Sequence, residues 1–213
     1  MMDPLNALFH SKERITANEK TLKKAGFKIL HKGNWSKMLV ISHQRLPGYL
    51  VKLYTDDEPN VIDWVKCKER VKGALSVAAC ITKNNWCTYF KVPKKWIYPL
   101  PQDPSYCGSN RKSFILLVED ADLISSEANL QKWESKKVST DCLTALYCLL
   151  KNEGLRDSVY PFNLPFSKDG RIAMIDTEFH HEWPVPFKRL TKYLSVKNQA
   201  HWSLLIEHGV SSF

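Results

Sequence analysis

Short apolar runs separated by turn residues constrain the fold of this chain most strongly. Gly33-Asn34 and Pro47-Gly48 divide three such runs near the start, and two more follow before residue 120. Runs of this length bounded by turn residues are typical of antiparallel strands. The sequence therefore predicts a five-stranded antiparallel sheet formed by residues 27–30, 37–42, 49–54, 92–98 and 114–118.

Apolar residues at helical spacing predict the helices. Residues 61–82 carry this spacing and predict one long helix between the third and fourth strands. Thr16-Ala-Asn-Glu19 matches a capping box, which predicts a helix over 17–25 that ends at Gly26. Further helices are expected over 140–152, with Gly154 as the stop, and over 197–208, and a strand over 171–176 is expected to end in an acid.

Composition narrows the class of protein. The net charge of +9 is concentrated in the first hundred residues, and it suits nucleotides, nucleic acid, acidic membranes or an acidic partner without choosing among them. Six cysteines form no C-x-x-C pair, so reduced thiols and no zinc site are expected. Because the longest aliphatic stretch is 114–118, we expect no secretory signal and no membrane span, and hence a cytoplasmic protein.

Residues 99–111 are rich in Pro, Gly, Ser and Asn and predict a hinge between two halves.

This order of strands, long helix, hinge, helix, polar loop and terminal acid resembles that of the protein kinases. Tyr49-Leu-Val-Lys52 is similar to the kinase V-A-I-K motif, and Glu69 follows 17 residues later inside the long helix, where kinases keep the glutamate that pairs with the lysine. The resemblance implies an α+β, two-lobed, protein-kinase-like fold. Its five-stranded antiparallel N-lobe would occupy residues 1–118, and a truncated helical C-lobe residues 119–213.

The resemblance also implies that the chain binds ATP and Mg²⁺. Lys52, held by Glu69, would orient the phosphates, with Ser36 at the position of the glycine-rich loop and Glu119 at the end of the strand that leads to the kinase hinge. Asn163 and Asp176 are 13 residues apart, the spacing of the catalytic-loop asparagine and the D-F-G aspartate. Their oxygen atoms are suitable magnesium ligands.

Asp157 is the candidate catalytic base. Gly154-Leu-Arg156-Asp157 resembles a degraded H-R-D motif, but Asp157 precedes Asn163 by six residues, whereas kinases have five. Either the loop contains a one-residue bulge or Asp157 is not the base. Only 37 residues follow Asp176, and they contain no A-P-E motif.

With so short a segment after Asp176, the chain resembles the minimal kinase-like effectors of pathogenic bacteria. That resemblance implies a protein Ser or Thr as the phosphate acceptor, ahead of a small alcohol or lipid, and action inside a host cell. Adenylylation is a further chemistry of kinase-like folds and stays open. The sequence specifies neither an activating partner nor an oligomeric state.

Two alternatives remain open. A pseudokinase would keep the metal ligands without turnover, and the displaced Asp157 favours it. Ile175-Asp176-Thr-Glu178 also resembles the first motif of the DEDD exonucleases, but no Asp follows Asp176 to supply their other ligands. The basic, aromatic segment 92–98 fits an edge strand better than a nucleic-acid surface, so we expect no stable nucleic-acid complex.

Overall fold

The computed structural model describes residues 2–10, 14–33, 37–58, 62–101 and 110–210. The chain divides into two units, the first formed by residues 1–71 and 94–120 and the second by 72–93 and 121–213. This division by contacts assigns residues 72–93 to the second unit, whereas the expected N-lobe included them. The lobe boundaries at 1–118 and 119–213 stay a prediction.

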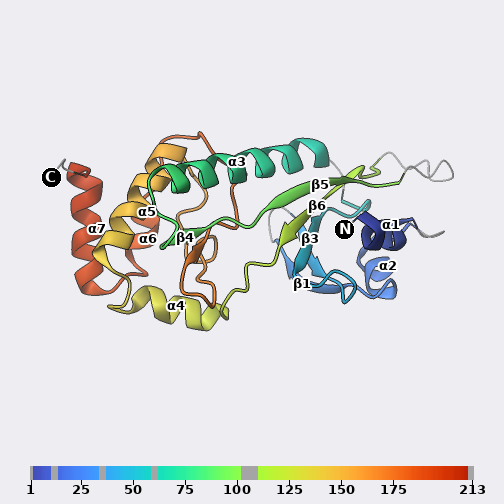
Figure 1. The fold of residues 1–213 in the computed structure, drawn as a ribbon, viewed down its shortest axis with the longest axis horizontal. Helices are drawn as coiled ribbons and strands as arrows, with labels where there is room; N and C mark the ends of the chain where they lie inside the picture. Colours follow the sequence, from blue (N-terminus) through green and yellow to red (C-terminus); the bar gives the residue numbers. More distant parts are fainter. Residues whose placement is uncertain (1, 11–13, 34–36, 59–61, 102–109, 211–213) are drawn as a thin grey trace. The chain divides into compact units, whose positions relative to one another are not determined.

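The first unit is built on a five-stranded antiparallel sheet (Figure 1). Its strands follow the order β1-β2-β3-β6-β5, so β3 is central and β5 lies at an edge. Both the strand number and the edge position of β5 are confirmed. The bounds are β1 (Lys28–Lys32), β2 (Leu39–Ser42), β3 (Tyr49–Leu53), β5 (Lys95–Pro99) and β6 (Phe114–Glu119).

Helices of the first unit bury both faces of this sheet. One face carries Val51, Ile115 and Leu117, which pack with residues of α1 (Met2–Phe9) and α2 (Glu19–Lys24), among them Leu5 and Leu22. On the other face, Leu116 and Val118 pack with Cys67 from the first part of α3 (Asp63–Lys83). Alternate residues of β6 therefore supply two separate clusters, as the period of a strand requires.

Two local predictions for this unit are wrong. Asn18, not Thr16, caps α2, because the Thr16 hydroxyl is buried and donates to Asp56 at 3.4 Å, while Asn18 and Thr21 form the capping box. The predicted hinge at 99–111 falls between β5 and β6, which pair with each other in one unit, so it does not separate two halves; its residues 102–109 lie outside the described residues. Helix α1 has no counterpart among the predicted elements.

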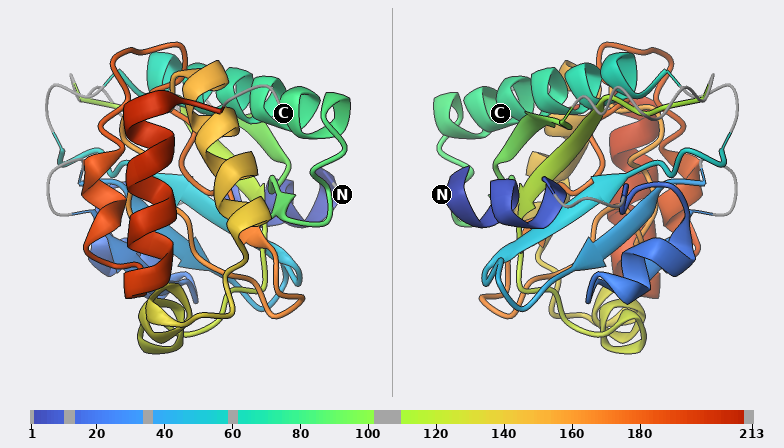
Figure 2. Two further views of the ribbon diagram at one scale, coloured as in Figure 1. Left: turned by 90° about the vertical axis from the view of Figure 1, so that its left-hand side faces the viewer. Right: turned by 90° about the vertical axis from the view of Figure 1, so that its right-hand side faces the viewer.

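The second unit contains the rest of α3 and four further helices, and the predicted α+β architecture with a helical second part is confirmed (Figure 2). Helix α5 lies beside α7, and its leucines, including Leu143, Leu146 and Leu149, are fully buried with Trp133 and Trp202. Gly154 ends α5 in a left-handed conformation, as expected. The bounds are α4 (Ser126–Glu134), α5 (Thr140–Glu153), α6 (Lys188–Thr191) and α7 (Val196–His208).

The strand predicted over 171–176 is much shorter than expected. Only β7 (Ile172–Ala173) forms, paired in parallel with β4 (Phe90–Lys91). Beyond it, Met174 still donates to the Lys91 carbonyl at 2.9 Å, but Ile175 turns back to the Ala173 carbonyl at 3.0 Å. Asp176 therefore lies in a loop and not at a strand end. Across the described ranges, no helix is both long and apolar enough to cross a membrane.

Candidate functional site

Lys52 and Glu69 lie on the same side of the first unit's sheet. Lys52 is directly opposite Val40 on β2 and Leu116 on β6, and such cross-strand partners point to the same face. Leu116 contacts Cys67 of α3, so this is the face that α3 covers. Glu69 lies on α3 two residues beyond Cys67, and both Lys52 and Glu69 are half-buried.

Glu119 has a structural role at the end of β6. Its carboxylate accepts a hydrogen bond from the Lys94 N–H at 3.0 Å, and its own N–H donates to the Lys94 carbonyl at 2.9 Å. These two bonds join the start of β5 to the end of β6. The Glu119 N–H is thus engaged within the sheet, and Ser36, the other residue expected near the nucleotide, lies outside the described residues.

Asp157, Asn163 and Asp176 come together in the second unit. The Asn163 side-chain amide donates to the Asp157 carbonyl at 2.7 Å, which folds the loop between them back on itself. The Ser158 hydroxyl donates to the Asp176 carbonyl at 2.7 Å, which joins this loop to the one after β7. The extra residue between Asp157 and Asn163 is accommodated in a loop whose turns include an Asn163 N–H bond to the Tyr160 carbonyl at 3.0 Å.

Side chains of helix α4 form hydrogen bonds with the second half of the same loop, residues 161–166. Asn129 is 2% exposed, and its amide donates to the Pro161 carbonyl at 2.8 Å while its oxygen accepts from the Phe166 N–H at 2.9 Å. Trp133, one turn further along, donates from its indole N–H to the Leu164 carbonyl at 3.1 Å. Two buried side chains therefore fix both flanks of Asn163, and no pattern of neighbouring residues in the sequence indicates this role for either of them.

Gly73 brings α3 close to the loop that carries Asp176. A Cβ atom at position 73 would overlap the Thr177 carbonyl oxygen and would lie 3.0 Å from Nδ1 of His180. Only glycine permits this approach of a helix to a neighbouring backbone. A glycine inside an otherwise regular helical pattern is the sequence signal that could have indicated the contact.

The segment after Asp176 returns to the end of α5. His181 donates from its N–H to the Glu153 carbonyl at 2.7 Å, and Glu182 donates to the Gly154 carbonyl at 3.0 Å. Trp183 donates from its indole to the Lys151 carbonyl at 2.8 Å. These bonds satisfy helix-terminal carbonyls that would otherwise lack partners, and they anchor the loop at its second end.

The Asp157 carboxylate lies 3.7 Å from the Arg189 guanidinium, and both side chains are largely exposed. Arg189 also lies over the Tyr160 ring, 5.1 Å from its centroid. Asp157 thus points to the same side of the loop as a pocket of about 760 Å³ whose lining includes Lys188, Arg189 and Lys192. An acceptor that approached Asp157 would meet positive charge.

The donor atoms at Asn163 and Asp176 suit Mg²⁺ with phosphate ligands. The Asn163 amide nitrogen is engaged with the Asp157 carbonyl, which leaves its oxygen as the atom able to bind a cation. In the described part of the chain, no group of three or more His, Cys, Asp or Glu side chains could hold a metal by itself. Magnesium commonly takes one or two protein oxygens and completes its shell with phosphate and water, so a two-residue set fits it.

Of the seven expected site residues, the six that the structure describes fall into two sets. Lys52, Glu69 and Glu119 belong to the first unit, whereas Asp157, Asn163 and Asp176 belong to the second. Within the first unit, Lys52 and Glu69 share a face and Glu119 lies at the end of the neighbouring strand. Within the second, hydrogen bonds connect all three residues through the loop.

Comparison with known proteins finds similarity to solved structures. No protein-family model matches the chain, and no curated protein matches it. Among solved structures, it is similar to a MAP kinase from Leishmania major, LmaMPK10, with a TM-score of 0.42 and 10% sequence identity over 99% of this chain and 67% of that one. A match of this strength implies no activity or substrate.

Proposed function

We propose that the chain is an ATP- and magnesium-dependent phosphotransferase of kinase-like fold that modifies Ser or Thr residues of a protein. The observation that carries the proposal is the hydrogen-bonded loop that gathers Asp157, Asn163 and Asp176. Buried side chains of α4 and the close approach of α3 hold this loop in place. Preorganisation of this kind is what the transfer of a charged group requires.

Each residue has a defined role in the proposed reaction. Lys52, oriented by Glu69, binds the α- and β-phosphates, with Ser36 and Glu119 at the nucleotide. Asn163 and Asp176 supply the oxygen ligands for Mg²⁺, which when bound neutralises phosphate charge. Asp157 accepts the hydroxyl proton of the acceptor. The hydroxyl oxygen then forms a bond to the γ-phosphorus, the bond to the bridging oxygen breaks, and ADP leaves.

A pseudokinase is the second candidate, and the contact between Asp157 and Arg189 favours it. A carboxylate paired with a guanidinium is less available to contact the hydroxyl group of an acceptor. Such a protein would bind ATP and Mg²⁺ without transfer. In either case we place its action in the cytoplasm, including that of a host cell, by its resemblance to bacterial effectors.

Binding is tested first, by thermal unfolding with and without ATP and Mg²⁺. Saturation at a hundred times the dissociation constant contributes about 2.7 kcal/mol, which raises the Tm of a domain of this size by roughly 5 to 10 °C. The shift should disappear in Asp176→Ala and Lys52→Met. It should persist in Asp169→Asn, a matched control in the exposed turn before β7. No shift in the wild type would refute the proposal.

Transfer is tested second, with γ-labelled ATP and protein acceptors. Asp157→Asn should lower the rate by about 100-fold or more if Asp157 is the base, while the ATP-dependent Tm shift is retained. Binding without measurable transfer by the wild type would support the pseudokinase. Transfer that survives in Asp157→Asn would remove Asp157 from its proposed role.

A further inference from the structure

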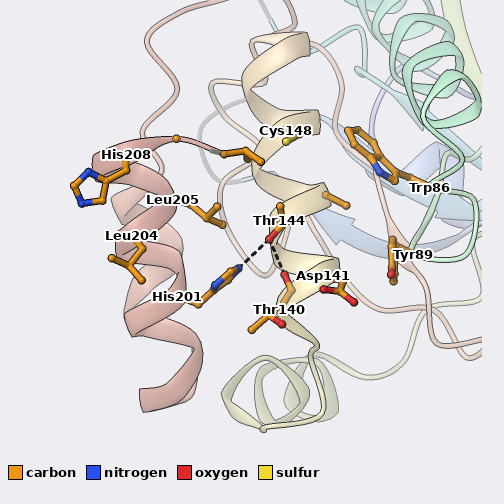
Figure 3. A pocket seen from close by; sticks show the side chains of 13 residues that line it. Trp86, Tyr89, Thr140, Asp141, Thr144, Cys148, His201, Leu204, Leu205 and His208 are labelled. Carbon is orange, nitrogen blue, oxygen red and sulfur yellow. Dashed lines mark hydrogen bonds between the residues drawn. The ribbon is translucent and has the colours of Figure 1, made fainter. Parts of the chain in front are cut away.

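The second unit contains a separate groove of about 810 Å³ along one face of α5 (Figure 3). The opposite face of α5 is filled with buried leucines, whereas Thr144, Ala145 and Cys148 on this face are small. Leu204 and Leu205 of α7 and the rings of Trp86 and Tyr89 also line the groove. Because small residues of α5 lie between larger neighbours, the surface there is hollowed to a size typical of small-molecule sites, roughly 300 to 1,000 Å³.

The charge of this groove differs from that of the whole chain. The chain has a net charge of +9, yet the groove lining contains no Lys or Arg and one carboxylate, Asp141. Burial raises the pKa of the Cys148 thiol, which keeps the sulfur neutral and apolar. The aromatic faces of Trp86 and Tyr89 attract cations. The single carboxylate without a basic partner in the lining and the two aromatic rings favour a positively charged ligand over an anion.

A hydrogen bond holds the His201 ring against α5. The Thr144 hydroxyl donates to the Thr140 carbonyl at 3.0 Å, and the same oxygen lies 2.9 Å from Nε2 of His201 (Figure 3). Since the hydroxyl has one proton and the carbonyl can only accept, Nε2 of His201 must carry the hydrogen and donate it to Thr144. In the neutral ring, Nδ1 is then a hydrogen-bond acceptor.

We infer that this groove binds a flat aromatic molecule that carries a protonated amine. The ring packs between the aromatic side chains and the leucines of α7. The ammonium group pairs with Asp141 and is a suitable donor for a histidine acceptor. The site is distinct from the Asp157 loop, and the inference does not depend on the proposed phosphotransferase activity.

The charge preference is tested with two probes that share one ring system. Tryptamine is a cation and indole-3-propionate an anion at neutral pH, and ligand-detected NMR titrations measure both at the roughly millimolar affinities expected for molecules of this size. Tryptamine should bind more tightly. Asp141→Asn should lower its affinity by about fivefold and leave the anion unchanged or tighter. Glu127→Gln, an exposed acid on α4, is the matched control and should change neither.

The location is tested with two variants of the groove. Cys148→Phe fills the floor and should abolish tryptamine binding, provided that circular dichroism shows a folded protein. Leu204→Ala, which truncates a 56% exposed side chain, should fold normally and weaken binding by about threefold. Equal affinity for the two probes, no binding of either, or binding unchanged in both variants would overturn the inference.

Discussion

Lys52 and Asp176 are held in place by different kinds of structure. Lys52 lies on the central strand β3, whose position is fixed by backbone pairing with β2 and β6. Asp176 lies beyond a two-residue strand, and side-chain bonds from Ser158 and α4, together with the close packing at Gly73, position its loop and the adjoining one. A sheet keeps its geometry when exposed side chains change, whereas these loops depend on a few specific side chains. Four substitutions test this difference.

Gly73→Ala should have the largest effect. The new methyl group would overlap a backbone carbonyl at Thr177, which cannot move without moving the Asp176 loop. We expect a loss of about 3 kcal/mol in the free energy of unfolding, even though alanine favours helix by about 1 kcal/mol. Urea denaturation measures the free energy of unfolding of this variant. Leu75→Ala, at a 67% exposed position of the same helix, should change stability by less than about 0.5 kcal/mol. Equal stability of the two variants would show that the loop tolerates displacement.

Asn129→Ala comes second. It removes the partners of two buried backbone groups, at Pro161 and Phe166, and should cost about 2 kcal/mol. The same variant should weaken the stabilisation by ATP and Mg²⁺, because the loop around Asn163 is less ordered. Gln131→Ala, on the exposed side of α4, is the control for thermal unfolding in both conditions. If ATP stabilises Asn129→Ala as much as the wild type, α4 does not position the loop for nucleotide binding.

Ser158→Ala should cost about 1 kcal/mol, because the Asp176 carbonyl loses one hydrogen bond near a residue that is 3% exposed. Because the bond joins the two loops, the change in the free energy of nucleotide binding should exceed the change in the free energy of unfolding. Isothermal titration with ATP and Mg²⁺ compares it with Ser126→Ala, an exposed serine at the start of α4. Equal affinities would assign the connection between the loops to other contacts.

Asp169→Asn should have the smallest effect. The Arg171 guanidinium, with Ser167 and Lys91, holds the pKa of the Asp169 carboxyl well below its usual range. A lowered pKa in the folded state stabilises the protein above the unfolded-state pKa near 3.9, and this contribution is lost as the pH falls below it. Because the carboxylate is 40% exposed, solvent limits the effect to less than about 1 kcal/mol.

Stability measured between pH 6 and pH 3 should therefore fall slightly less in Asp169→Asn than in the wild type. A difference of several kcal/mol would mean that surface ion pairs, and not the buried bonds, hold these loops.

The sequence by itself determined the strands of the five-stranded sheet and the longer helices. Strand and helix periods are local, so the five strands, the extent of α5 and its stop at Gly154 followed from short-range patterns. The capping of α2 was misassigned because the Thr16 hydroxyl has a partner 40 residues away, at Asp56. Local capping rules do not contain such a partner.

Only the tertiary structure decided how the candidate site is supported. Asn129 bonds to a backbone group 37 residues further along the chain, and Ser158 to one 18 residues further. Gly73 matters because a carbonyl more than a hundred residues later lies against it. Such contacts form when the core brings distant segments together, and no pattern of neighbouring residues records them. The residue types of the site could be read from the chain, while the side chains that hold them required the fold.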